Sequence, residues 1–199
     1  MLNEKRQEQV LHSAKEVFSE KGFHKASISD IIQRAGIARG TFYLYFKNKR
    51  HIFDCLLESL LEELDRRIKT IELGQGKPPP LEQLRANING VIAFSMEEPH
   101  LIQILVHHAM GLDQELDRML DNFYERVTER IEWALTLGMG IGLVRPCSTR
   151  LVAYAILGGM QEVMRQLASD RISAPELKAV VDSLLEFGLR GVLAESVQG

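Results

Sequence analysis

The residues best suited to chemistry lie between positions 35 and 49, where an arginine, hydroxyl groups, tyrosines and lysines alternate with apolar side chains. Ile37, Phe42 and Phe46 recur at a spacing that places them on the inner face of a short helix. Five residues are left on its outer face: Arg39, Gly40, Thr41, Tyr43 and Leu44. Guanidinium and hydroxyl groups bind phosphates and base edges, an aliphatic side chain can contact a thymine methyl, and glycine lets the backbone come close to a partner. The segment therefore has the chemistry of a DNA-reading helix.

Three short helices must position this segment. Apolar residues at helical spacing mark a first helix, which we expect to stop before Gly22. Ser27 and Asp30 then form an S-x-x-D capping box, which predicts a second short helix ending at Gly36. The third segment follows two or three residues later and runs over about 38–46. Two short helices joined by a tight glycine-containing turn form the helix-turn-helix pattern, whose second helix enters the major groove of DNA.

At these residues the sequence resembles the TetR/AcrR family of bacterial transcriptional regulators. The resemblance covers the first 55 residues and rests on the capped helix from Ser27, the pair Ala35-Gly36, the run Gly40-Thr41-Phe42-Tyr43-Leu44-Tyr45-Phe46 and the step Lys47-Asn48-Lys49. The rest of the chain matches that family only in its length and its succession of helices. One departure is Ala38, where the family commonly has a serine as the N-cap of the recognition helix.

The resemblance implies a role in DNA binding for eight residues. Phosphate contacts are expected from five side chains: Ser27, Thr41, Tyr43, Tyr45 and Lys49. Arg39 would read a guanine edge, Leu44 would contact a thymine methyl, and Gly40 would allow a close approach to the DNA. The alternative for Tyr43 and Tyr45 is that they are packing residues with hydrated hydroxyl groups.

The charge distribution fits a polyanion-binding head. Residues 1–51 hold ten lysines and arginines against five acidic residues, a net charge of +5, whereas the whole chain carries −3. The remainder of the chain therefore carries −8. A basic first quarter on an acidic body is typical of a protein with a nucleic-acid-binding part, although charge alone fits a hydrated basic face equally well.

Helical periodicity continues along the chain and predicts an all-α fold, with an N-terminal three-helix helix-turn-helix head joined to a larger helical domain. We expect a DNA-binding domain at residues 1–47 and a helical effector-binding and dimerisation domain at residues 48–199. A long helix should begin at Asn48, and a linker rich in glycine and proline follows at 74–80. Further helices are expected at 81–97, 100–111, 114–138, 148–169 and 174–196.

A small-molecule effector site is expected in the larger domain. Aromatic and thioether side chains with a few polar tips are typical of pockets for apolar ligands. The candidate residues are Phe94, Ile104, His107, Met110, Phe123, Tyr124, Tyr154 and Met164. Because most residues of this kind form plain core, we expect fewer than half of them to touch a ligand.

The last two predicted helices carry more apolar surface than a two-helix edge facing water needs. In the family that the chain resembles, the last two long helices of each subunit form a four-helix dimer interface. The resemblance therefore implies a homodimer, and the candidate interface residues are Ile156, Met160, Val163, Val181, Leu184 and Leu185.

Other classes of function are disfavoured. Cys55 and Cys147 form no CxxC pattern, and His107 and His108 point about 100° apart on a helix, so we expect no metal, no cofactor and no enzyme. The glycines of 138–142 lack the G-x-G-x-x-G spacing and a preceding strand, which predicts a helix end and a turn instead of a phosphate loop. No run is apolar enough to cross a membrane and no secretory signal is visible, so we expect a cytoplasmic protein.

The predicted function is that of a ligand-responsive transcriptional regulator. The family resemblance favours a repressor over an activator. A small, largely apolar effector would release this repressor from a palindromic operator in double-stranded DNA. The alternative is a DNA-binding regulator with no small-molecule effector, controlled by protein partners or by concentration. An enzyme using His107 and His108 is a third interpretation.

Overall fold

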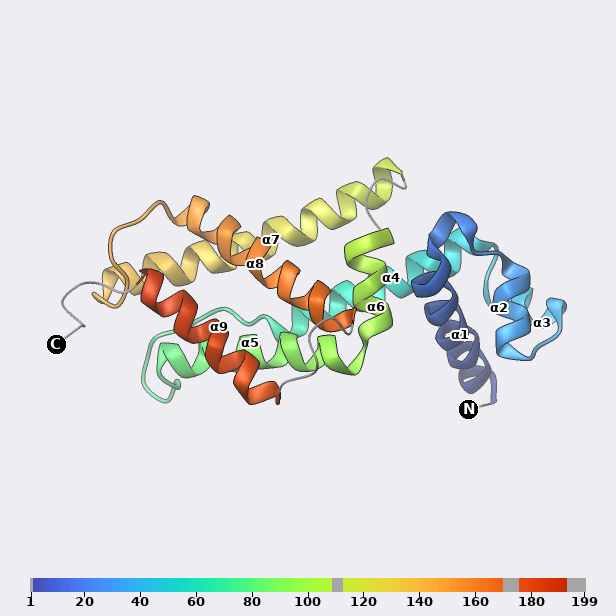
Figure 1. The fold of residues 1–199 in the computed structure, drawn as a ribbon, viewed down its shortest axis with the longest axis horizontal. Coiled ribbons are helices and arrows are strands. Elements are labelled where there is room, and N and C mark those ends of the chain that lie inside the picture. Colours follow the sequence, from blue (N-terminus) through green and yellow to red (C-terminus); the bar gives the residue numbers. More distant parts are fainter. Residues whose placement is uncertain (1, 109–112, 170–175, 193–199) are drawn as a thin grey trace. The chain divides into compact units, whose positions relative to one another are not determined.

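The computed structural model of the chain describes residues 2–108, 113–169 and 176–192 (Figure 1). For residues 2–4, 107, 108 and 190–192 it describes the backbone only. Helices dominate these ranges, which confirms the predicted all-α fold. The elements are α1 (Leu2–Lys25), α2 (Ile28–Ala35), α3 (Arg39–Tyr45), α4 (Lys49–Arg67), α5 (Pro80–Glu97), α6 (Pro99–Gln103), the π-helix η1 (Ile104–His108), α7 (Gln114–Gly140), α8 (Thr149–Ala168) and α9 (Leu177–Val192).

The first helices begin and end close to where the sequence predicts, except that α1 continues beyond a kink at Gly22 to Lys25. The backbone leaves the helical conformation at Gly22, with φ of 71° and ψ of 165°. Ser27 caps the start of α2, and Gly36 ends it in the left-handed conformation with φ of 61°. Asn48 caps α4, because its Oδ1 accepts the backbone N–H of His51 at 2.8 Å. These boundaries are predictable because each depends on one local side chain or one glycine.

The later helices agree with the expected ranges except in two places. The helix expected at 100–111 changes its hydrogen-bond register, so that α6 is followed by the π-helix η1. One π-helical turn inserts a single residue, which is too small a change for a periodicity argument to detect. The capping residues expected for the last helix lie mostly outside the described residues, and α9 begins at Leu177.

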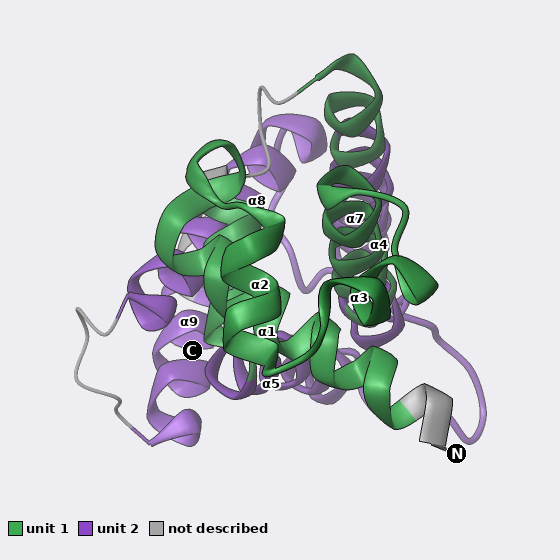
Figure 2. Cartoon of the chain, turned by 90° about the vertical axis from the view of Figure 1, so that its right-hand side faces the viewer, with its two compact units in different colours: residues 1–63, 98–120 green, residues 64–97, 121–199 purple. Residues whose placement is uncertain are grey.

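The chain divides into two compact units (Figure 2). Residues 1–63 and 98–120 form the first unit, and residues 64–97 and 121–199 form the second. The first unit therefore contains α6 and η1 as well as the helix-turn-helix. The expected division after residue 47 concerns which part binds DNA and which part binds the effector. Compactness does not test that division, so it stays a prediction.

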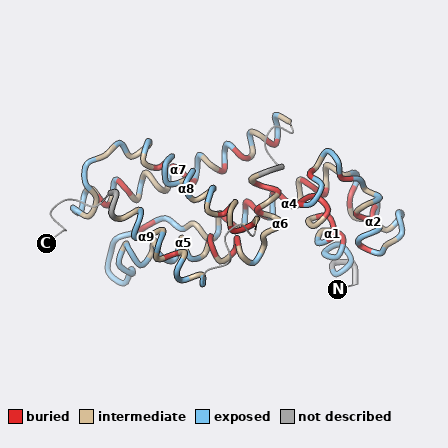
Figure 3. Tube along the Cα trace, in the orientation of Figure 1, coloured by how far each residue is buried: buried red, intermediate tan, exposed pale blue. Residues whose placement is uncertain are grey.

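The buried core of the first unit, red in Figure 3, contains a group of aromatic side chains. Phe18, Phe42, Phe46 and Phe53 are each 1% exposed or less. The rings of Phe18 and Phe53 meet edge to face with centroids 5.0 Å apart, and the ring of Phe23 lies 4.9 Å from that of Phe53. Aromatic pairs of this kind contribute about 0.5–1.5 kcal/mol each beyond the area that they bury. The cluster thereby joins α1 to α4.

The second unit has its own apolar core among α5, α8 and α9. Ile92, Leu167, Val181 and Leu185 are buried together, and α5 packs against both of the last two helices. Partly buried residues from the same three helices surround this cluster. Each of the last two helices therefore turns one apolar face toward its own subunit.

A tight turn follows α7 at the glycine-rich segment, as the sequence predicts. The N–H groups of Leu143 and Val144 both donate to the carbonyl of Gly138, at 2.8 and 3.1 Å. A Cβ atom on Gly138 would lie 2.5 Å from Cγ2 of Val144, whereas a Cβ on Gly140 would meet no atom within 4 Å. The close return of the chain therefore requires glycine at 138 but not at 140.

We predict that Gly138→Ala lowers the free energy of unfolding by about 1–3 kcal/mol, because the stiff Val144 side chain must move away from the new methyl group. Gly140→Ala is the matched control, since it adds a methyl group in open space and changes stability by no more than about 1 kcal/mol. Urea unfolding followed by circular dichroism measures both. Equal effects of the two changes would contradict the packing argument.

Candidate nucleic-acid interface

Helix α3 turns phenylalanines inward and presents its other side chains outward. Phe42 is fully buried, and Phe46, directly after the helix, is 1% exposed. On the opposite side Leu44 is 78% exposed and Tyr43 is 49% exposed, and Arg39 is exposed as well. The structure thus brings the predicted base-reading residues together on one exposed face. The packing that anchors the helix also determines which residues it presents.

The backbone of this face is accessible at Gly40. No atom lies within 4 Å of the position that a Cβ would take there, so a partner can approach the main chain closely. Thr41 and Tyr45 are half-buried. Ala38 gives α3 no side-chain cap, but its carbonyl accepts the N–H of Thr41 at 2.9 Å. The first turn of α3 forms without the serine that the family commonly has.

The capping box of α2 orients the start of the helix-turn-helix. The Ser27 N–H donates to Oδ2 of Asp30 at 2.9 Å, and the Asp30 N–H donates to Oγ of Ser27 at 3.1 Å. Lys21 donates to Oδ1 of Asp30 and the Ser27 hydroxyl to Oδ2, each at 2.8 Å. These bonds, with Lys21 the largest contributor, stabilise the carboxylate and lower the pKa of Asp30 to about 2. The hydroxyl proton of Ser27, a predicted phosphate ligand, is therefore engaged in the cap.

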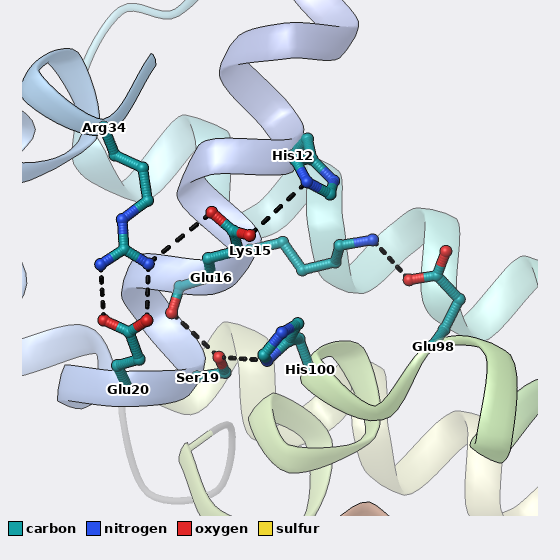
Figure 4. Close-up of polar contacts among 8 residues, drawn as sticks. All are labelled: His12, Lys15, Glu16, Ser19, Glu20, Arg34, Glu98 and His100. Atoms are coloured by element: carbon teal, nitrogen blue, oxygen red, sulfur yellow. Dashed lines mark hydrogen bonds and ion pairs between the residues drawn. The ribbon is translucent and has the colours of Figure 1, made fainter. Parts of the chain in front are cut away.

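Charged side chains anchor α2 to α1 (Figure 4). Arg34 donates to both carboxylate oxygens of Glu20, at 2.5 and 2.7 Å, and lies 3.6 Å from Glu16. This bidentate pair lowers the pKa of Glu20 and raises the pKa of Arg34. At the C-terminal end of α2, Nε2 of Gln9 donates to the carbonyl of Ala35 at 2.7 Å. Helix α2 is thus held against α1 by side chains as well as by its apolar face.

Helix α1 is also bonded to α6 within the first unit (Figure 4). Lys15 forms an ion pair with Glu98, the residue before α6. Oγ of Ser19 lies 2.8 Å from Nδ1 of His100 and donates to the carbonyl of Glu16 at 2.9 Å. The hydrogen bond between Ser19 and His100 therefore joins α1 to α6.

The basic residues at the start of α4 have different surroundings. Lys49, a predicted phosphate ligand, is half-buried, and its ammonium donates to the carbonyls of Phe23 and Ala26 at 2.6 and 2.9 Å. Arg50 is paired with carboxylates. Lys47 is exposed. The predicted set omitted Lys47, although the Lys-Asn-Lys step contained it, because a sequence does not show which of two neighbouring lysines is engaged within the fold.

The predicted effector-site residues fall into both units. Phe94, Phe123 and Met164 are buried in the second unit, each 5% exposed or less, and Ile104 is fully buried in the first. The guanidinium of Arg67, which the prediction missed, lies 4.8 Å from the centroid of the Phe94 ring. Two predicted residues lie outside what is described: the side chain of His107 and the whole of Met110. The effector site therefore stays a prediction.

The two predicted tyrosines of that site differ in exposure. Tyr124 of α7 is half-buried and hydrogen-bonds with Gln161 of α8, and burial raises the pKa of its hydroxyl. Tyr154 of α8 is 50% exposed, and its hydroxyl accepts a hydrogen bond from Nε of Arg150 at 2.8 Å. Only Tyr124 lies in partly apolar surroundings of the kind that an effector pocket needs.

Most of the predicted dimer residues are used inside the subunit. Val181 and Leu185 are 2% and 6% exposed and belong to the core cluster with Ile92. Three others pack around that cluster: Met160, Val163 and Leu184. The apolar periodicity of α9 thus reflects, at least in part, packing against the core of its own subunit.

The outward surface of α8 and α9 carries other apolar residues. Ile156 is 37% exposed, and Leu151 and Phe187, which the prediction did not include, are 68% and 82% exposed. Gly158 and Gly159 are exposed as well, with no atom within 4 Å of an added Cβ. The two helices thus expose large apolar side chains, and α8 also has positions where another backbone can approach closely.

The described part of the chain offers no group of three or more His, Cys, Asp or Glu residues that could hold a metal ion. Cys55 and Cys147 are half-buried free thiols, and burial raises the pKa of Cys55. Among the described helices none is long and apolar enough to cross a membrane.

Comparison with known proteins finds regulators. Residues 10–56 match the sequence model of the family described as bacterial regulatory proteins, tetR family. An uncharacterised HTH-type transcriptional regulator of Bacillus subtilis is 52% identical over 62 residues, which cover 31% of this chain and 32% of that relative. The crystal structure of a TetR-like transcriptional regulator from Rhodococcus sp. RHA1 is 26% identical, with 94% of each chain covered and a TM-score of 0.75. The transcriptional regulator FadR from Bacillus subtilis, solved in complex with stearoyl-CoA, is 25% identical, with 92% of this chain and 97% of that one covered and a TM-score of 0.68.

The capping box makes the stability of the head depend on acid pH. Because the pKa of Asp30 falls from 3.8 to about 2 on folding, its contribution is complete above about pH 4 and is lost as the pH falls through about 2. We predict that Asp30→Asn abolishes this part of the decline in unfolding free energy between pH 4 and 2. Asp121→Asn, at an exposed carboxylate of α7, is the control. Urea unfolding at a series of pH values measures the decline, and parallel curves for wild type and Asp30→Asn would contradict the assignment.

Proposed function

Because the chain belongs to the TetR family of bacterial regulatory proteins, we propose that it is a transcriptional repressor that binds a pseudo-palindromic operator as a homodimer and is released by a small, largely apolar effector. The observation that carries the DNA-binding part is the outer face of α3. There Leu44 is 78% exposed between the buried Phe42 and Phe46. An aliphatic side chain kept in water on such a small helix contributes nothing to the core, and it fits contact with a thymine methyl in the major groove.

Charge and geometry support the same function. Arg39 extends the exposed face with a guanidinium that can bind a guanine edge through two hydrogen bonds. The excess of basic residues in the first quarter of the chain supplies attraction for the phosphate backbone. Two identical heads related by a two-fold axis require inverted half-sites about 34 Å apart, or a multiple of that distance, along one side of the duplex.

For the effector we propose a molecule with a long apolar chain. FadR, which resembles this chain over nearly its whole length, is solved in complex with stearoyl-CoA. The interior of the second unit is mostly aliphatic and aromatic, and the half-buried Tyr124–Gln161 pair offers a polar contact within it. Since the relatives found are regulators, binding is favoured over catalysis by His107 and His108. A regulator that responds to protein partners or to concentration is the second candidate, and an absence of stabilisation by acyl-CoAs of several chain lengths would favour it.

Helix α1 is placed to pass a change in α6 to the DNA-reading helices. Lys15 and Ser19 contact the α6 region, while Glu16 and Glu20, on neighbouring positions of α1, hold Arg34 of α2. A shift of α6 that breaks its contacts with Lys15 and Ser19 also changes how Glu16 and Glu20 hold Arg34. Coupling of this kind is typically about 1–3 kcal/mol and is reciprocal, so operator DNA weakens effector binding by the factor by which effector weakens operator binding.

For base reading, we predict that Arg39→Ala and Leu44→Ala each lower discrimination at one base pair of the half-site by about 1–3 kcal/mol, because each removes a single base contact. The measurement is the affinity for a duplex selected from a random pool by the wild-type protein, compared with its single-base variants. Leu73→Ala, which removes a 47% exposed leucine outside the head, is the control. If either change weakens selected and random duplexes equally, that residue contacts only the backbone.

For dimerisation, we predict that Phe187→Glu and Ile156→Glu give monomers that remain folded, because each places a charge on an exposed apolar position of the proposed interface. Leu73→Glu should leave the dimer intact. Leu185 is unsuitable for this test, since a charge there disrupts the subunit's own core. Sedimentation equilibrium gives the mass and thermal unfolding checks the fold. Dimers that survive both changes would place the interface elsewhere.

A further inference from the structure

We propose that Lys49 is a positioning residue of the DNA-binding head, not a phosphate ligand, and that Lys47 supplies the phosphate-binding charge of the Lys-Asn-Lys step. The proposal rests on the DNA-binding function proposed above. It differs from the phosphate-binding role that the family resemblance implies for Lys49, and it gives Lys47 a role that the resemblance does not assign.

The ammonium of Lys49 already has partners within the protein. It donates to the carbonyl oxygens of Phe23 at 2.6 Å and Ala26 at 2.9 Å. It also lies 4.4 Å from the centroid of the Phe23 ring, whose face attracts a cation. Two of its three N–H groups are thereby used, and the aromatic ring covers part of the charge. A phosphate would have to compete with these contacts.

The two carbonyls need this donor because of the capping box. In a continuous helix, the carbonyls of Phe23 and Ala26 would accept the N–H groups of Ser27 and Asp30, four residues later. Instead the Ser27 N–H donates to the Asp30 carboxylate, and the Asp30 N–H donates to the Ser27 hydroxyl. Ala26 is buried, with 4% exposure, so water is a poor substitute. Lys49 therefore donates to the two carbonyl groups that lose their helical partners to the capping box.

This contact ties together the parts of the head that must hold α3. Lys49 is the first residue of α4, whereas Phe23 and Ala26 lie at the corner between α1 and α2. The Phe23 ring beneath the ammonium packs against Phe53 of α4. Helices α2 and α3 are consequently connected to α4 at both ends of the motif, by the chain after α3 and by Lys49.

Lys47 is the contrasting lysine. Its side chain is exposed, and within the described residues its ammonium forms no hydrogen bond or ion pair. Its backbone N–H donates to Nδ1 of His51 at 3.2 Å, which fixes the main chain beside the start of α4. An exposed ammonium whose backbone is held next to a helix N-terminus is well placed to bind a phosphate.

The salt dependence of DNA binding separates the two roles. The probe is a duplex of random sequence, for which the slope of log K against log salt counts neutralised phosphates. Lys47→Met should reduce that slope by about 0.9 for each head on the DNA. Lys49→Met should leave the slope unchanged and lower the affinity for a selected operator by about tenfold, as for one lost base contact. Lys49→Arg should restore operator affinity, because its guanidinium can donate to both carbonyls. An equal loss of slope in both methionine variants would overturn the proposal.

A measurement on the wild-type protein covers the case in which Lys49→Met does not fold. The NMR signals of the two lysine ammonium groups are followed as the random duplex is added. The Lys49 signal should carry a ring-current shift from Phe23 and stay in place, while the Lys47 signal moves. Movement of the Lys49 signal alone would overturn the proposal. Failure of the wild-type protein to bind any duplex would instead contradict the proposed function.

Discussion

The reciprocal hydrogen bonds between Ser27 and Asp30 are the constraint on which the head depends. They start α2 in a fixed direction from the corner that follows Gly22. They also consume the two N–H groups that would otherwise continue the helical hydrogen bonding from the end of α1. The cap therefore creates unsatisfied carbonyls in a partly buried corner, and Lys49 reaches across from α4 to satisfy them. One local motif thus determines both the helix direction and a long-range contact.

The exposed face of α3 is a consequence of what is buried. Seven residues of α3 give two helical turns, too few for stability without tertiary packing. Phe42 and Phe46 supply that packing, and their burial leaves Arg39, Tyr43 and Leu44 outside. In the proposed function, this face makes the base contacts and the basic residues around it supply affinity for the phosphate backbone. Basic side chains that are paired with carboxylates of the same unit, such as Arg34, contribute more to stability than to the attraction for phosphates.

In the second unit, the apolar residues of α9 fall into two groups, one buried in the core and one exposed. Val181 and Leu185 complete the subunit's own core with Ile92, and Phe187, only two residues after Leu185, is 82% exposed. Neighbouring residues on a helix point about 100° apart, so one helix can pack inward and outward at the same time. The outward residues remain available for a second subunit after folding is complete.

The sequence by itself determined the helical class, the helix boundaries in the head and the inner and outer faces of α3. These follow from short-range physics, in which a capping side chain, a glycine or a 3.6-residue period acts within a few residues. Tertiary structure alone decided that Lys49 is engaged and Lys47 is exposed, that Val181 and Leu185 are buried in their own subunit, and that α6 belongs with the head. Each of these depends on contacts between residues far apart along the chain. A linear pattern shows that a side chain is basic or apolar, and only the packed chain shows which partner it meets.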